Sequence, residues 1–399
     1  MSVWPRAGFL ATDDWLPALP VLLALRRRLA AIGFHTTAAL PLPGNVLDLP
    51  LDVANARAFV RGRQNLFHHS ALAGAYRRVL GHQNPEAVAL HELLTLNRML
   101  PRARVAELLS PRLLDELVDH GVFSEDEGIV ESNIVAAVSG GRVYLADAPH
   151  LRDDPDYVYL GRSSFSPAGY LASIDWRPPR HSARAPRRML DLGCGAGPAA
   201  VAAGAAGVEH VIGTDIVERC LRYARLNAAL NGVDTTEFRY SDVLSAVEGD
   251  FDLIVSNAPC VWEELQQATF ATGGADFGTA LPVRMIREAL GRLRPSGLMY
   301  VVMTAPIVDG DDYVVEAMRR ACREHSVEVC IHPELAEYEV EQRSVLRRHK
   351  ISSFIRYGVV IEFADRFSVS VGSSFDAMRY RTYGVRSRAT RAAAALVRA

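Results

Sequence analysis

The sequence predicts an α/β protein in which a mostly parallel sheet, covered by helices on both faces, follows a mainly helical domain. Strand-like and helix-like segments alternate after residue 186, whereas helical periodicity dominates before residue 150. A proline-rich, basic stretch at 176–186 separates the two patterns. We therefore expect a helical domain over 1–150, a connecting segment and linker over 151–186, and the α/β domain over 187–399.

Composition sets few further limits. The chain has 399 residues, 49% hydrophobic and 23% charged, as in ordinary globular proteins. Its net charge of -2 gives no global reason to expect nucleic acid or an anionic membrane as partner. No apolar stretch approaches the roughly 20 residues of a membrane helix. The five cysteines are odd in number and lack CxxC spacing, which favours reduced thiols and a cytoplasmic location.

The first 120 residues contain helical signals. Apolar side chains at helical spacing predict a helix over 87–100, ended by Pro101. A short helix is expected at 105–109. Ser110 is expected to be the N-cap of a further helix, which extends to residue 119.

A hairpin is expected next, where 134–138 and 142–145 flank two glycines. Helix, short helix, helix and hairpin is the order of elements in a winged helix, a frequent DNA-binding unit. The expected recognition helix, 112–119, carries three acidic residues and one arginine, and such a surface repels phosphates. We therefore expect this domain to form a homodimer or to cover the substrate as a lid, and we expect no nucleic-acid partner.

Strands and helices alternate in the second half of the chain, which predicts parallel pairing. Strands are expected at 189–192, 211–215, 237–240, 252–256, 298–303, 327–331 and 359–363. Helices are expected at 197–206, 217–230, 282–293 and 313–325.

A glycine-rich turn at 193–197 joins the first of these strands to its helix. Such turns let a ligand approach the backbone and the helix N-terminus, and they serve dinucleotides and S-adenosylmethionine. The dinucleotide pattern is GxGxxG, but here Pro198 takes the place of the third glycine. Asp191, just before the turn, could hold a cationic amino group, which suits an amino-acid moiety better than a pyrophosphate.

Acidic residues also follow the next two strands. Asp215, followed by Ile216, can accept hydrogen bonds from both hydroxyls of a ribose, as it could in a dinucleotide site. Asp242 can accept from the amino group of adenine, and Val243 offers its backbone N–H to the ring.

A fourth motif, 252–260, ends in Asn257-Ala258-Pro259-Cys260. In order and spacing the four motifs resemble class I methyltransferases over about 189–304. The branch with an Asn-Pro-Pro-aromatic motif, which includes release-factor glutamine and N6-adenine methyltransferases, is the most similar. Residues 159–165 also look like the opening segment of bacterial relatives with an extra N-terminal domain.

The resemblance implies a Rossmann-like domain with a mostly parallel seven-stranded sheet and S-adenosylmethionine as cofactor. It places Asp191 and the glycines at the methionine end, Asp215 at the ribose, Asp242 at the adenine and Asn257 beside the accepting atom. The candidate cofactor residues are Asp191, Gly193, Cys194, Gly195, Gly197, Asp215, Ile216, Asp242, Val243 and Asn257, and Asn257 is also the candidate catalytic residue.

The acceptor motif departs from the related pattern at two positions. Ala258 replaces the first proline, and Cys260 replaces the aromatic residue that stacks on a planar acceptor. A thiol cannot stack, which weakens the case for a purine or a glutamine amide. Trp262 either replaces the ring or belongs to the core. No positive neighbour in sequence lowers the pKa of Cys260, so we expect a packing role.

We therefore predict N-methylation of a small-molecule or amino-acid-like acceptor. The candidate acceptor residues are Ala258, Pro259, Trp262 and Glu263. Glu263 or Glu264 could serve as a base for an oxygen or charged-amine acceptor, and the glycines of 272–278 predict a mobile substrate loop.

Four alternatives remain open. These are an O-methyltransferase of a specialised metabolite, an enzyme that uses the sulfonium differently, a cofactor-binding regulator, and a DNA-binding regulator.

The histidines His68, His69, His82 and His91 form no convincing metal constellation, and we expect no metal.

Overall fold

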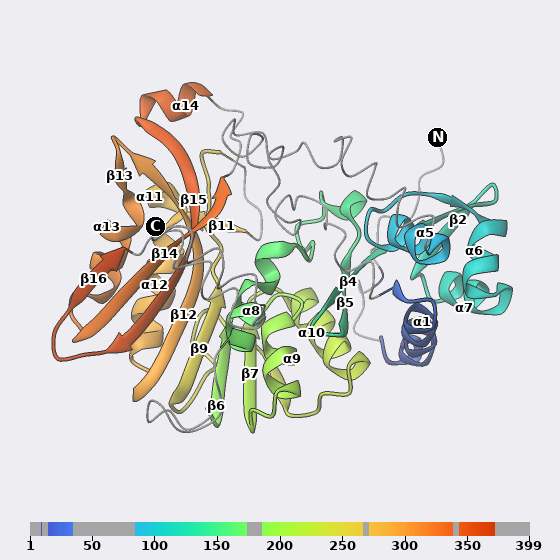
Figure 1. Ribbon diagram of the computed structural model, residues 1–399, viewed down its shortest axis with the longest axis horizontal. Helices are drawn as coiled ribbons and strands as arrows, with labels where there is room; N and C mark the ends of the chain where they lie inside the picture. The colour runs from blue at the N-terminus through green and yellow to red at the C-terminus, as the bar shows by residue number, and fades with distance from the viewer. Residues whose placement is uncertain are drawn as a thin grey trace, which may run out of the picture.

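The computed structural model describes residues 9, 15–34, 84–173, 186–265, 271–337 and 343–371. Figure 1 shows the N-terminal helices at one end of the molecule and the large sheet at the other. Most of the expected linker, 176–185, lies outside the described residues, as do His68, His69 and His82.

Helices dominate the N-terminal region. The helix expected at 87–100 is shorter, because it ends at Leu94. The predicted cap of the third helix is confirmed, since Ser110 Oγ accepts a hydrogen bond from Leu113 N at 3.3 Å. The helices are η1 (Leu16–Ala18), α1 (Leu19–Ala31), α5 (Pro85–Leu94), α6 (Arg102–Leu109) and α7 (Pro111–Asp119). Among the described helices, none is both long and apolar enough to cross a bilayer.

Two small sheets follow these helices. The expected hairpin at 134–145 is present as β4 (Ile134–Ser139) and β5 (Arg142–Asp147), but it forms a sheet of its own. The strands directly after α7 are β2 (Phe123–Asp126) and β3 (Ile129–Ser132), and β3 also pairs with β1 (Leu100–Pro101). The hairpin that directly follows α7 is therefore β2 and β3, and not the one expected at 134–145.

The large sheet has the strand order β16-β14-β15-β12-β9-β6-β7-β8, and β13 pairs with β12 beside this path. The neighbours from β12 to β8 are parallel, whereas β15 is antiparallel to both β12 and β14. The predicted Rossmann-like, mostly parallel sheet is confirmed, with β13 and β16 added to the seven expected strands. The strands are β6 (Arg188–Leu192), β7 (His210–Asp215), β8 (Thr236–Tyr240), β9 (Phe251–Asn257), β12 (Leu293–Val308), β13 (Asp311–Asp312), β14 (Val327–Glu337), β15 (Ile351–Phe363) and β16 (Ser368–Val371).

Helices cover both faces of this sheet (Figure 1). One apolar core joins α8, α9 and α10 to the sheet and continues into the N-terminal helices, while the other core lies under α12 and α13. The remaining elements are η3 (Pro149–Leu151), η4 (Arg162–Phe165), α8 (Ser166–Ser173), α9 (Pro198–Ala205), α10 (Glu218–Leu230), β10 (Val261–Trp262), β11 (Thr272–Gly274), α11 (Ala275–Gly278), α12 (Ala280–Leu290), α13 (Tyr313–Cys322) and α14 (Arg343–Arg348).

A buried ion pair joins the N-terminal region to α10. Arg219 Nη2 lies 2.7 Å from Asp147 Oδ1, and both side chains are almost fully buried. The other guanidinium nitrogen, Nη1, contacts Asp154 at 2.8 Å, and Tyr223 donates its hydroxyl to Asp147 at 2.8 Å. Each charge at this junction has a partner of opposite sign. Loss of one partner would leave the other charge buried and unpaired, which is strongly destabilising.

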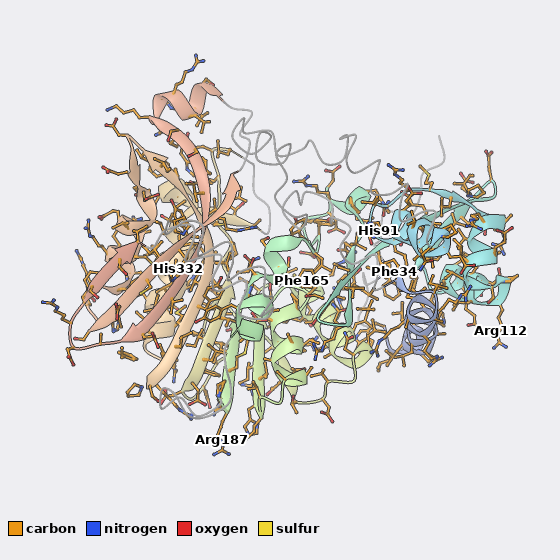
Figure 2. The ribbon with its side chains drawn as sticks, viewed as in Figure 1. Phe34, His91, Arg112, Phe165, Arg187 and His332 are labelled. Carbon is orange, nitrogen blue, oxygen red and sulfur yellow. The ribbon has the colours of Figure 1, made fainter. Side chains whose placement is uncertain are left out.

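We predict that Arg219→Met lowers the free energy of unfolding by about 3–5 kcal/mol, because Asp147 loses its counter-charge. Urea denaturation measures this change. Arg187→Met is the control: Arg187 extends into solvent at the edge of the sheet (Figure 2), and it pairs with a half-exposed Glu209. Its loss should change stability by about 1 kcal/mol or less. Equal effects of the two substitutions would contradict a structural role for the buried pair.

Candidate cofactor and acceptor site

The parallel strands bring the predicted site residues to one edge of the sheet. Because β6, β7, β8 and β9 run in the same direction, their carboxyl ends meet there. Asp191 is the second-last residue of β6, Asp215 ends β7, and Asn257 ends β9. Asp242 follows β8 after one residue.

The glycine-rich turn follows β6 and leads into α9. Gly193, Gly195 and Gly197 have φ values of 71°, 54° and 79°, in the left-handed region that favours glycine. A Cβ on Gly197 would lie 2.9 Å from the Ala224 Cβ on α10, so this position also needs the absence of a side chain. A Cβ on Gly195 would meet no atom within 4 Å, so the turn is open on that side. Cys194 is buried within the turn, and burial raises the pKa of its thiol.

Asp191 is buried beneath this turn. Its Oδ2 accepts a hydrogen bond from Ala200 N in the first turn of α9, at 3.0 Å. The carboxylate therefore stabilises the N-terminus of α9. Burial raises the pKa of Asp191 to about 7.

Asp215 connects the glycine-rich turn to the end of β7. Its Oδ2 accepts from Gly195 N at 2.8 Å, and its Oδ1 accepts from Val217 N at 3.0 Å. Each oxygen keeps a second lone pair for another donor. The next residue, Ile216, is 55% exposed. Tyr240, which pairs with Asp215 between β8 and β7, is 57% exposed.

Tyr240 was missed in the sequence analysis. The signal was its position, since an aromatic residue directly before the 241–243 motif must lie at the same sheet edge as Asp215. The exposure of two large apolar side chains next to Asp215 is a property of binding surfaces.

Asp242 is exposed and forms a two-point ion pair. Its oxygens lie 3.0 and 3.1 Å from the Nη1 and Nη2 atoms of Arg284 on α12. No sequence spacing links Arg284 to this motif, and it was missed. Val243 has a φ of 51°, which is strained for a β-branched residue, and Ser241 Oγ donates to its carbonyl at 2.9 Å. Strain of this kind is common at ligand sites.

Asn257 is the last residue of β9 and lies opposite Val302 of β12. The chain is fixed directly after it, because Ala258 N donates to Val302 O at 2.9 Å. Ala258 is buried, whereas Asn257 and Pro259 are half-buried. None of the hydrogen bonds among the described residues uses the Asn257 side chain.

Cys260 lies beside Thr304 of β12. Burial raises the pKa of its thiol, and the opposing influence of Thr304 and Arg356 does not reverse this. The thiol is therefore protonated near neutral pH, which supports the packing role expected from the sequence.

Trp262 is 4% exposed and packs edge-on against Phe277 and His349, with ring centroids 5.0 Å apart in both pairs. Of the two roles left open by the sequence, this burial supports the core. Glu263 is exposed, and Glu264 forms an ion pair with Arg348 of α14.

The glycines of 272–278 pack tightly against the acceptor motif. A Cβ on Gly273 or Gly278 would overlap the backbone of Cys260. The segment also pairs with β10 through β11, and Asp276 binds Arg320 at 2.8 Å. Close backbone packing therefore explains Gly273 and Gly278, which were expected to permit closure of a substrate loop.

The segment 159–165 ends in η4, and α8 follows it against β9 and β12. Tyr170 of α8 stacks on Tyr300 of β12 with ring centroids 3.9 Å apart. This segment therefore packs beside α9 and, through α8, against β9 and β12. Among the described residues, no group of three or more His, Cys, Asp and Glu side chains could hold a metal ion.

Comparison with known proteins identifies the family of this region. Residues 180–308 match the model of the methyltransferase small domain. The ribosomal protein L11 methyltransferase of Lactobacillus johnsonii is 40% identical over 72 residues, which are 18% of this chain and 23% of that protein. The enzyme of the same name from Thermotoga neapolitana is 46% identical over 70 residues, 18% of this chain and 26% of that protein. The chain thus spans about a quarter of the length of the curated relatives it matches.

Three solved structures show low overall similarity to this chain. A ribosomal protein L11 methylase from Lactobacillus delbrueckii subsp. bulgaricus has 22% identity and a TM-score of 0.31, over 49% of this chain and 77% of that one. A complex of aTrm5 with tRNALeu has 13% identity and a TM-score of 0.38, over 59% and 56%. TYW2 of M. jannaschii in complex with AdoMet has 10% identity and a TM-score of 0.38, over 59% and 91%.

These findings correct the expectation of a small-molecule or amino-acid-like acceptor without a nucleic-acid partner. The matched relatives are named for a protein substrate. The expectation rested on Cys260, which excludes one stacking contact but carries no information about the size of the acceptor.

The turn, the carboxylates and the family match concern the same stretch of chain. Residues 180–308 form a class I S-adenosylmethionine-dependent methyltransferase domain.

Proposed function

We propose that the chain is an S-adenosylmethionine-dependent methyltransferase that methylates a nitrogen atom of a polypeptide. The observation that carries the proposal is the position of Asn257. It ends β9 at the same sheet edge as the glycine-rich turn after β6, and β6 and β9 are direct neighbours. An acceptor held by Asn257 therefore lies next to the cofactor.

The residues of the edge fit the cofactor. The open side of Gly195 leaves room for close approach, Asp191 offers a carboxylate to an ammonium group, and Asp215 keeps lone pairs for ribose hydroxyls. Ile216 and Tyr240 provide an apolar surface for a purine ring. S-adenosylmethionine supplies an electrophilic methyl group when bound.

Asp242 has a conditional role in this proposal. Arg284 engages both of its oxygens, so the adenine amino group must share this carboxylate or displace the arginine. An exposed ion pair contributes about 1 kcal/mol or less, so either exchange is inexpensive.

The acceptor side aligns a nitrogen and needs no strong base. The Asn257 side-chain oxygen and the Ala258 carbonyl can each accept a hydrogen bond from an NH or NH2 group, which orients its lone pair. Cys260 is protonated and is no nucleophile. Pro259 restricts the backbone between Ala258 and β10. Glu263, directly after β10, is exposed.

A polypeptide acceptor is supported by the relatives, which are named ribosomal protein L11 methyltransferases.

We further propose that 85–132 form a winged-helix-like unit. The order α5, β1, α6, α7, β2 and β3 supports this, together with the pairing of β1 with β3. The expected boundary at residue 150 would then move to about 132, because β5 binds α10 of the methyltransferase region.

The acceptor class can be tested by label transfer from tritiated S-adenosylmethionine. Purified ribosomal protein L11, a ribosome-free protein extract and bulk tRNA are offered separately. Label in acid-stable amide or amine linkage on protein is the expected result. Label on tRNA alone, or cofactor consumed without label in either polymer, would refute a polypeptide methyltransferase.

We predict that Asn257→Ala lowers kcat about 100-fold or more on the labelled acceptor, because the nitrogen loses its alignment. Asn257→Asp keeps an accepting oxygen and should retain more activity than the alanine variant. Circular dichroism should show the same thermal midpoint for both variants. Near-normal turnover by Asn257→Ala would remove Asn257 from the mechanism.

The raised pKa of Asp191 predicts pH-dependent cofactor binding. Its folded-state pKa of about 7 exceeds the ordinary value of about 3.9, so the folded protein retains this proton over most of that interval. Binding an ammonium group requires the ionised form. The affinity for S-adenosylhomocysteine should therefore rise as the pH increases to about 7 and then level off. Calorimetry at several pH values should show this rise in the wild type and a flat, weaker profile in Asp191→Asn; an equal rise in both would contradict the assignment.

A further inference from the structure

Asn227 of α10 is a fully buried amide whose polar atoms all have partners. Its Oδ1 accepts from Leu145 N at 2.8 Å, and its Nδ2 donates to Leu145 O at 2.9 Å, both on β5. The second hydrogen of Nδ2 goes elsewhere, to Ala196 O at 2.9 Å. One side chain thus binds the β4–β5 hairpin and the glycine-rich turn at once.

Ala196 lies between two anchored residues of that turn. Gly195 N is held by Asp215, and Gly197 packs against Ala224, one helical turn before Asn227. The hydrogen bond from Asn227 of α10 therefore fixes the turn at Ala196. A buried carbonyl without a donor is unfavourable, so the turn would shift if this donor were lost.

Asn231 provides a natural comparison one helical turn later. Its Oδ1 accepts from Val143 N at 3.2 Å, and its Nδ2 donates to Val143 O at 2.7 Å, so it binds β5 in the same way. Its other Nδ2 bond goes to Asn227 O within α10, at 2.8 Å. Asn231 thus holds the hairpin but does not contact the turn.

We propose that Asn227 is a positioning residue for the cofactor: it holds the glycine-rich turn in its binding conformation and couples that conformation to the docked β4–β5 hairpin. The two asparagine side chains bond the backbone N–H and C=O groups of Val143 and Leu145 on β5, whose other side pairs with β4. They thus take the place of a neighbouring strand. Only Asn227 transmits this docking to the turn. The inference rests on the proposed cofactor site.

The test compares Asn227→Ser with Asn231→Ser. Both substitutions remove the same pair of bonds to β5, and serine is too short to reach either partner. Calorimetric titration with S-adenosylhomocysteine measures affinity, and thermal unfolding with and without this ligand measures stability. Asn227→Ser should weaken affinity about tenfold, the equivalent of about 1.4 kcal/mol, whereas Asn231→Ser should stay within about twofold.

The outcomes distinguish a failure of the proposed cofactor site from a failure of the positioning role of Asn227. A wild-type protein that does not bind S-adenosylhomocysteine refutes the proposed cofactor site itself. With a binding wild type, unchanged affinity in Asn227→Ser overturns the positioning role. Equal losses in both variants also overturn it, because they would reflect hairpin docking alone. If Asn227→Ser does not fold, the isosteric Asn227→Asp replaces it, with Asn231→Asp as its control and the same criteria.

Discussion

Parallel pairing of β6 with β7 on one side and with β9 on the other is the constraint on which the whole site depends. It brings the carboxyl ends of these strands together, and with them Asp191, Asp215 and Asn257. A parallel sheet needs a crossover after each strand, so every one of these ends leads into a turn or a helix N-terminus. The cofactor side and the acceptor side are therefore adjacent because of strand order, before any side chain is considered.

Within this frame, the glycine-rich turn is fixed from several directions. Asp215 holds Gly195, Ala224 restricts Gly197, and Asn227 holds Ala196. A turn fixed in advance loses little conformational freedom when a ligand binds, which favours affinity. Two of these contacts come from α10, which is also joined to the N-terminal region through Arg219 and Asn227. The N-terminal region is thus part of the structural support of the proposed cofactor site.

Much of this arrangement follows from local sequence. Periodicity located the strands of the sheet, and the glycines of 193–197 located the turn after β6, because both signals are short-range. The partners of Asp242 and Asn227 were not predictable, since Arg284 and Leu145 are distant in sequence and reach them only through packing. The strands β2 and β3 were not predicted because each has only four residues and a single buried apolar side chain, Phe123 or Val130. The acceptor was misjudged because one substitution was taken to describe a whole surface.

The central claim is that this turn binds an amino-acid sulfonium cofactor and not a dinucleotide. Pro198 in place of the third glycine and the buried Asp191 distinguish the two, and both are properties of the turn itself. Calorimetric titration of the full-length protein with S-adenosylhomocysteine and, separately, with NAD tests the claim most directly. Saturable binding of one S-adenosylhomocysteine per chain, without heat from NAD, is the predicted result. Binding of NAD in the absence of S-adenosylhomocysteine binding would contradict it.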